Sequence, residues 1–379
     1  MKNQAKRVVL SSLLPFLVFS TQLFAVDVEQ LAKDVAMLKE QNESLKTAKE
    51  SNAKSGFQIA GYAAFDYSDD EFSGVKFAPI FHSKYGDILQ FEGELEFTMD
   101  PTTGETVTEL EYAAATLFLN NYMGLQVGKF MSPIGQFVQN QHPSWINKLP
   151  DAPLGFGHDG AAPTSNVGIA LRGGLPKIAG LRSNYVLFVS NAPVYGKTED
   201  GAVEGSIDAE GKVTSNGAQP TVGVRYALNP LSQMEIGISG AVGEIVDTNN
   251  TKSVRDYNVF DVDFMYNIDA LSLKAEYVKQ IIGTSTINSI DPDGGEWQAW
   301  YAQASYQFTQ FPVEPVLRYS DYHNPETKRN QLVLGLNYLL ANNLIAKFAY
   351  QFNSNEDATI AATDVTNSDI FRAQLAFGF

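Results

Sequence analysis

The sequence contains no cysteine, and beyond its first residues it has no long hydrophobic run. Without cysteine, neither a disulfide framework nor a thiolate-ligated metal site can form. The absence of eighteen consecutive apolar residues after residue 25 excludes a membrane-spanning helix there. Positive charge is also scarce, because 43 Asp and Glu outnumber 27 Lys and Arg. A nucleic-acid partner needs clustered positive charge and is therefore not expected.

Residues suited to catalysis are few as well, since the chain has 4 histidines. His142 and His158 share one segment with Asp151 and Asp159, a set that could form a metal site or an acid–base pair. Histidines in loops more often hydrogen-bond within the loop itself. Residues 291–296, DPDGGE, lack the remaining ligands of a calcium loop and are explained by a turn. We expect no enzymatic activity, no cofactor and no metal.

Residues 1–25 have the organisation of a secretory signal peptide. Three positive charges precede an apolar run at 8–19, and the segment ends at the small residue Ala25. A retained membrane anchor is the competing interpretation, and Pro15 and Ala25 favour cleavage. We therefore predict an exported protein.

Residues 26–55 form a different kind of segment, with apolar residues at alternating spacings of three and four. This spacing predicts a short periplasmic coiled coil, in which Asn42 at a core position would set register and oligomeric state. About three heptads are marginal alone, so something larger must hold the helices together. The alternative is a single amphipathic helix packed on the protein. The predicted oligomerisation residues are Val28, Leu31, Val35, Leu38, Asn42 and Leu45.

Residues 89–100, LQFEGELEFTMD, alternate apolar and acidic or polar side chains. A period of two predicts a strand with one apolar and one acidic face. In a soluble sandwich the apolar face would form the core, whereas in an outer-membrane barrel it would face lipid and the acids would face a water-filled lumen.

The rest of the chain favours the barrel. Every second connection is short and rich in turn residues, such as NN at 120–121, and the intervening ones are mostly longer, above all 131–165. Short turns on one rim and long loops on the other are typical of a barrel in the outer membrane. We predict an all-β fold in which residues 56–379 form a 16-stranded antiparallel transmembrane barrel. The strands are predicted to begin near residues 57, 75, 88, 106, 122, 166, 181, 221, 233, 257, 271, 297, 313, 331, 344 and 369.

Aromatic residues make up 12% of the chain and include 17 Tyr. Several Tyr, among them Tyr112, Tyr185 and Tyr226, fall at the ends of apolar faces, where an interfacial girdle is predicted. The final strand alternates from Phe371 to Phe379 and ends in LAFGF.

The signal peptide, the sixteen strands, the long connection after the fifth strand and the terminal Phe379 together resemble trimeric Gram-negative outer-membrane porins. The coiled coil and VGKFMSPIG at 127–135 are more similar to the phosphate-selective porin O and P group. The resemblance implies a homotrimer in the cell outer membrane, in contact with lipid and lipopolysaccharide. It also implies an assembly signal in Phe379.

By the same resemblance, residues 131–165 are a constriction loop that folds into the barrel; the alternative is a loop that closes over the mouth. The loop residues singled out are Phe137, His142, Trp145, Lys148, Asp151, His158 and Asp159.

The alternation of side chains along each predicted strand indicates which charged residues face the lumen. Acids on two neighbouring strands and bases on later strands would create a transverse field, although any single charge can equally serve to keep the lumen wet. Acids such as Glu276 interrupt the basic series, which puts phosphate specificity in doubt. The predicted acidic residues are Glu92, Glu94, Glu96, Glu109 and Glu111. The predicted basic residues are Arg172, Arg182, Arg225, Lys274, Arg318, Lys347 and Arg372.

These observations predict a porin, that is, a passive diffusion channel for small hydrophilic solutes and ions. Two alternatives stay open. One is a substrate-specific channel for anions or dicarboxylates, and the other is a structural or adhesive barrel with a plugged pore.

Overall fold

The computed structural model describes residues 55–100, 103–157, 160–178, 180–195, 207–208, 217–247, 254–284, 294–325, 327–355 and 368–379. The predicted signal peptide and almost all of the predicted coiled coil lie outside the described residues, as do His158 and Asp159. Ser55, which the sequence assigned to the coiled coil, instead begins the first strand.

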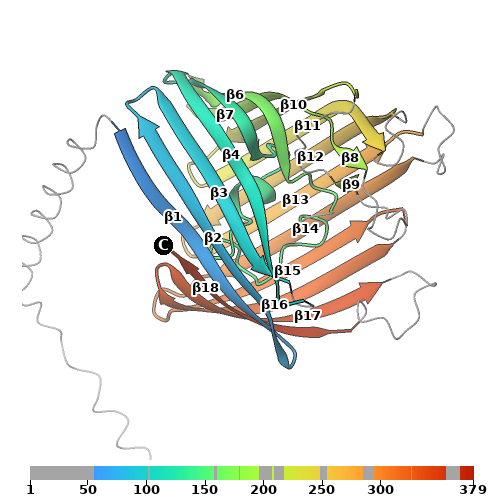
Figure 1. Cartoon of the computed structure of the whole chain (residues 1–379). Coiled ribbons are helices and arrows are strands. Elements are labelled where there is room, and N and C mark those ends of the chain that lie inside the picture. The colour runs from blue at the N-terminus through green and yellow to red at the C-terminus, as the bar shows by residue number, and fades with distance from the viewer. Residues whose placement is uncertain are drawn as a thin grey trace, which may run out of the picture. The chain divides into compact units, whose positions relative to one another are not determined.

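Eighteen strands form one sheet (Figure 1). Their bounds are β1 (Ser55–Ser68), β2 (Glu71–Tyr85), β3 (Leu89–Met99), β4 (Thr106–Asn120), β5 (Met123–Met131), β6 (Ser165–Ile178), β7 (Leu181–Ser190), β8 (Val194–Tyr195), β9 (Ile207–Asp208), β10 (Thr221–Asn229), β11 (Met234–Asp247), β12 (Val254–Ile268), β13 (Leu271–Ile282), β14 (Gly295–Tyr306), β15 (Val313–His323), β16 (Lys328–Ala341), β17 (Leu344–Asn355) and β18 (Ile370–Gly378).

The sheet closes on itself, because β1 pairs with both β2 and β18 in antiparallel register. The two-residue strands β8 and β9 lie outside the ring, where β7 pairs directly with β10 and β8 runs parallel to the end of β11. The remaining sixteen strands form the predicted closed antiparallel barrel, and each begins within four residues of its predicted start. Within the described residues, no helix has the length and apolar character needed to cross a membrane.

The alternation of side chains places the apolar residues outside. On β16, Leu332, Leu334 and Leu336 are exposed, whereas Gln331 and Asn337 are buried inside the ring. The strand LQFEGELEFTMD follows the same rule, because its Phe91 is exposed and its Glu94 and Glu96 are buried. This arrangement excludes the apolar core of a soluble sandwich and agrees with an inside-out barrel.

A β-bulge corrects one prediction about the aromatic residues. Glu94 pairs with Tyr112 and the next residue, Leu95, pairs with Leu110, so Glu111 is an extra residue in β4. The bulge reverses the parity of the strand beyond it. Tyr112 therefore shares the inward face with Glu94 instead of joining an outer girdle, and this prediction was wrong.

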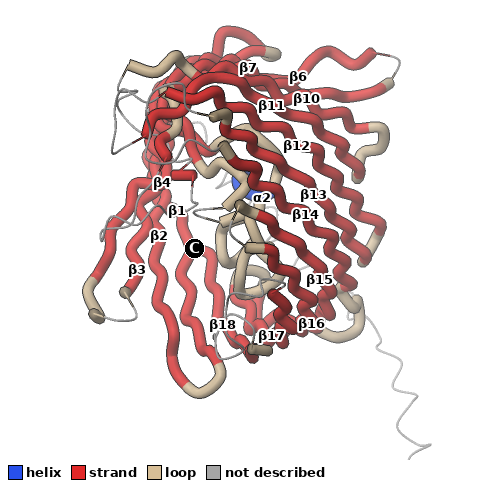
Figure 2. The backbone as a smooth tube through the Cα atoms, turned by 90° about the vertical axis from the view of Figure 1, so that its right-hand side faces the viewer, coloured by secondary structure: helices blue, strands red, loops and turns tan. Residues whose placement is uncertain are grey.

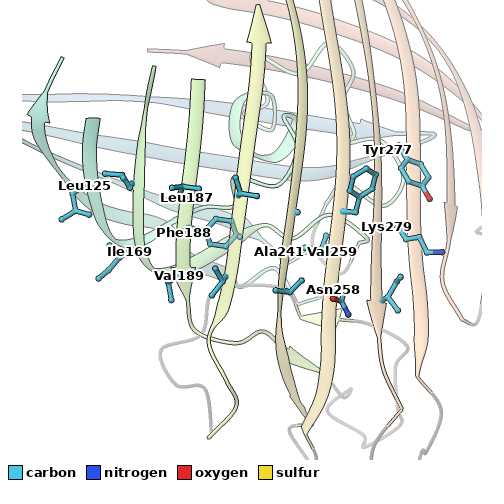
Figure 3. Close-up of a pocket in the computed structure, with 18 residues that line it drawn as sticks. Leu125, Ile169, Leu187, Phe188, Val189, Ala241, Asn258, Val259, Tyr277 and Lys279 are labelled. Carbon is cyan, nitrogen blue, oxygen red and sulfur yellow. The ribbon is translucent and has the colours of Figure 1, made fainter. Parts of the chain in front are cut away.

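A depression of about 1050 Å³ lies on the outer face, over β5 to β7 and β10 to β13 (Figure 3). Its lining is mostly aliphatic and includes Leu125, Ile169 and Leu187, with Lys279 among its few polar members. Gly240 also lines it and leaves space where a side chain would stand. The depression is formed by the apolar outer faces of these strands, so it is not part of a pore.

The end of the chain completes the seam of the barrel. The backbone N–H of Phe379 donates to the carbonyl of Gly61 at 2.9 Å, and the N–H of Gly61 donates back at 3.0 Å. The Phe379 ring stacks on Phe77 of β2 with a centroid separation of 5.8 Å. The terminal residue thus connects the last strand to the first two.

We predict that Phe379→Ala weakens closure of the barrel, because the loss of the stacked ring costs about 1–2 kcal/mol. The measurement is the fraction of refolded protein that migrates as a compact, heat-modifiable band in unheated detergent gels. Phe371→Ala, on the same strand and also exposed, is the matched control. Equal folded fractions for the two variants would contradict a special role for Phe379.

Candidate pore and its internal loop

Residues 132–164 join β5 to β6 and are called the internal loop below; those that the structure describes, 132–157 and 160–164, lie inside the ring of strands. Figure 2 shows the short helix α2 (Phe137–Asn140) within the barrel, surrounded by strands. Polar inward-facing side chains of β11, β13 and β15 to β18 bind this loop. The structure therefore places the segment in the lumen and not over the mouth.

The first attachment holds the backbone just before α2. The carboxylate of Glu276 on β13 accepts hydrogen bonds from the N–H groups of Gln136, at 3.0 Å, and Phe137, at 2.9 Å. The N–H of Gly135 donates to the Ser239 hydroxyl at 3.0 Å. Gly135 has φ +74°, and a Cβ there would collide with the carboxylates of Glu276 and Asp261. Only glycine combines this conformation with this close approach.

The second attachment holds the middle of the internal loop. Lys347 donates from its ammonium group to the carbonyl of Ser144. Asn337 donates to the carbonyl of Lys148 at 2.9 Å, and the Lys148 ammonium group lies 2.9 Å from the Glu314 carboxylate. Each backbone carbonyl that is bound in this way avoids the cost of burial without a partner.

The third attachment centres on Asp151. The Arg318 guanidinium donates to the carbonyls of Asp151 and Ala152 at 2.9 and 3.1 Å. The Asp151 carboxylate accepts from Gln351 at 2.5 Å and lies 3.3 Å from Nε of Arg372. Three strands, β15, β17 and β18, thus contribute to the fixation of one stretch of the loop.

Apolar packing fills the space behind the internal loop. Phe137, Phe156 and Tyr301 form a triangle of edge-to-face contacts, with Phe156 and Tyr301 separated by 5.0 Å. Leu149 is buried against Val316 and Val333 of β15 and β16. These contacts pack the loop against this part of the barrel.

The predicted basic residues face inward, but several do not line open water. Exposed fractions are 3% for Arg225 and 0% for both Arg318 and Lys347. Arg225 pairs with Glu235 on β11 and Asp263 on β12, and the other two bind the internal loop. The prediction of a basic face opposite the acids across open water therefore does not describe Arg318 and Lys347, which the loop covers, and Arg225 is neutralised by its two acidic partners.

The other predicted bases have different surroundings. Lys274 donates to the side chain of Gln141 at 2.9 Å and so also contacts the internal loop. Arg172 donates to Gln126 at 3.2 Å, and Arg182 is exposed near the short turn between β6 and β7.

The predicted acids line the opposite side of the barrel. Glu96 accepts from the Tyr62 hydroxyl at 3.1 Å and lies 2.6 Å from the Lys76 ammonium group. Glu94 and Glu111 are buried beside it, whereas Glu92 contacts His82 at 2.9 Å. Glu109, directly opposite Glu96 in the ladder, is exposed.

Two internal cavities flank the internal loop. One, of about 590 Å³, lies between α2 and the short-turn rim and is lined by Gln139, Arg172 and Glu235, among others. The other, of about 320 Å³, lies between the loop and β1 to β4 and β18, with Glu96 and Glu111 in its lining. The empty space is thus on the acidic side of the loop and beneath it.

The singled-out loop residues occupy distinct places. Phe137 is in the aromatic triangle, Lys148 and Asp151 are in the attachments, and Trp145 lies against Gly378 of β18. A ring nitrogen of His142 donates to the carbonyl of Val138 at 2.6 Å, a bond within the loop itself. Among the described residues, no group of three His, Asp or Glu side chains is arranged to hold a metal ion.

Sequence reasoning missed the anchoring residues Ser239, Asn337 and Gln351, and it named Glu276 only as an interruption in a basic series. The alternation along each strand already indicated that these side chains face inward. Their hydrogen-bond partners could not be predicted, because each partner lies roughly a hundred or more positions away in the sequence.

The fold defined here is that of porin-type barrels of bacterial outer membranes. The anion-selective porin from Comamonas acidovorans superposes with a TM-score of 0.58 at 14% identity, over 86% of this chain and 100% of that one. The outer-membrane channel DcaP of Acinetobacter baumannii gives 0.57 at 10% identity, over 86% and 98%. The trimer form of OmpT from Vibrio cholerae gives 0.51 at 13% identity, over 86% and 100%.

By sequence, residues 192–324 match the family model of the S-layer protein SlpA β-barrel domain. None of the curated proteins matches this sequence. These three structures are described as a porin, a channel and an outer-membrane protein. The similarity to them is one of fold.

We predict that Glu276→Gln loosens the internal loop. An amide can accept from only one of the two N–H groups, so one charge-assisted hydrogen bond is lost, at about 1.5–3 kcal/mol. The backbone N–H groups of Gln136 and Phe137 should then exchange with deuterium about tenfold faster or more. The measurement is the hydrogen–deuterium exchange rate of the peptide that contains them, followed by mass spectrometry.

The matched control is Glu244→Gln, which alters an exposed carboxylate that accepts a backbone N–H from Gln219, remote from the internal loop. Equal exchange rates of the Gln136 and Phe137 N–H groups in the two variants would contradict the role assigned to Glu276.

Proposed function

We propose that this chain is an outer-membrane porin, through which small hydrophilic solutes and ions diffuse passively. The observation that carries the proposal is the internal loop, which is fixed inside a closed barrel and leaves cavities of about 590 and 320 Å³ beside it. A loop that narrows a polar lumen without filling it sets a size limit for diffusion.

The exterior supports insertion in a bilayer. Closed barrels satisfy every strand's hydrogen bonds, which a hydrocarbon environment requires. Exposed apolar residues surround the ring, and aromatic ones such as Tyr85, Tyr226 and Tyr338 are among them. Facing lipid, these residues have a favourable environment that water would not provide.

We further propose a homotrimer that contacts lipid and lipopolysaccharide and is exported with a cleaved signal peptide. The trimer rests on the resemblance to trimeric porins, on the OmpT structure described as a trimer, and on the predicted heptads with Asn42.

A structural or adhesive barrel is the second candidate. The match of residues 192–324 to an S-layer β-barrel domain favours it. In this case the barrel would serve as an anchor, and its loops would bind a partner. A substrate-specific anion channel is a third possibility, favoured by the likeness to an anion-selective porin.

We predict stepwise conductance when folded protein is added to a planar lipid bilayer, with insertion steps in groups of three. Conductance should rise in proportion to salt concentration for passive diffusion, and saturation would instead indicate a specific binding site. Heat-denatured protein is the control. Folded protein that produces no steps would contradict the porin proposal and favour the structural barrel.

A further inference from the structure

The internal loop divides the lumen unequally. Behind it, toward β11 to β17, buried residues from the loop and the barrel pack together, and the cavity between the start and end of the loop and β10 to β12 measures only about 10 Å³. In front of it, toward β1 to β4 and β18, lies the cavity of about 320 Å³. A solute that passes the loop must therefore travel along β1 to β4.

This route carries an excess of negative charge. Asp66, Glu96 and Glu111 of the barrel and Asp151 of the loop line the cavity, and Lys76 is the one lysine or arginine among its described lining residues. Lys76 pairs with Glu96, and Arg372 pairs with Asp151. Arg318 and Lys347, which could balance the remaining acids, are held behind the loop and bound to its carbonyls. The excess of negative charge along this route is therefore a consequence of where the loop lies.

Glu94 provides a separate indication. Its side chain is 1% exposed, and its Oε1 atom accepts no hydrogen bond. It lies on the same inward face of β3 as Glu96, which lines the cavity. Glu94 thus adds another acidic side chain to this side of the barrel.

The internal loop contributes apolar side chains to the cavity as well as polar ones. Phe137, Val138, Pro150 and Phe156 line it beside the polar loop residues His142, Ser144 and Asn147. Acids on the barrel together with apolar side chains on the loop complement a small molecule that has a positive charge and a hydrocarbon body.

We propose that the route past the internal loop is selective for cations and that it prefers small organic ammonium ions to carboxylates of the same size. Glu96 and Glu111 are the residues that determine this selectivity. The proposal rests on the porin function proposed above and names the class of solute that the route favours.

The test is the reversal potential of bilayer-inserted protein in a gradient of potassium chloride. We expect a reversal potential whose sign indicates that cations permeate more readily than anions. The double variant Glu96→Gln, Glu111→Gln should lower the ratio of cation to anion permeability about fivefold, since each removed charge borders the route. Lys76→Gln should raise the ratio, which gives a second, independent readout if the double variant folds poorly.

The matched control is Glu244→Gln, Glu296→Gln. It removes two carboxylates as well, but from the outward-facing sides of β11 and β14, where Glu296 pairs with Lys279 at 2.7 Å. This control should keep the wild-type ratio. Ethylammonium chloride and potassium propionate then replace potassium chloride as organic probes, and ethylammonium should permeate faster than propionate.

The outcomes separate the two proposals. Conductance with anion preference, or an unchanged ratio in the Glu96→Gln, Glu111→Gln variant, overturns the cation selectivity and leaves the porin function standing. Faster permeation of propionate than of ethylammonium overturns the preference for organic ammonium ions. Absence of conductance from folded protein overturns both proposals.

Discussion

The arrangement of the lumen depends on one constraint, which is that the backbone of the internal loop must find hydrogen-bond partners inside a narrow barrel. The described residues of this loop include little regular structure, so their N–H and carbonyl groups cannot satisfy one another as a helix or strand would. The barrel supplies the partners instead. Glu276 accepts two N–H groups, and Arg318 and Lys347 donate to carbonyls. Charged side chains are suited to this task because their hydrogen bonds are stronger than neutral ones.

This constraint also decides where the empty space lies. The strands that bind the internal loop, β11 to β17, are closed off by it, whereas β1 to β4 keep their acids beside a cavity. Buried side chains such as Arg225 are therefore structural, although their charge and inward direction would also suit a pore lining. The distinction between a residue that faces inward and one that faces water comes from the loop and not from the strand.

Most of the barrel was predictable because its pattern is local. The two-residue period of strands such as β16 and the short turns between them are visible within about ten residues, and all sixteen strands were found. The bulge at Glu111 was not predictable, since one extra residue in β4 becomes visible only in its pairing with β3. The hydrogen-bond partners of the internal loop were likewise hidden, because Asp151 and Arg318 are far apart in sequence and meet only in three dimensions. Strand alternation therefore predicts which charged side chains face inward, but it does not predict which of them the loop covers.

The central claim is that water passes in front of the internal loop and not behind it. The chain lacks cysteine, so single cysteines can report accessibility without background. The most direct measurement compares the reaction of a small water-soluble thiol reagent with Glu111→Cys, in front of the loop, and with Val333→Cys, which contacts Leu149 behind it. The account predicts rapid modification and reduced conductance for Glu111→Cys only. Equal reactivity at both positions would contradict it.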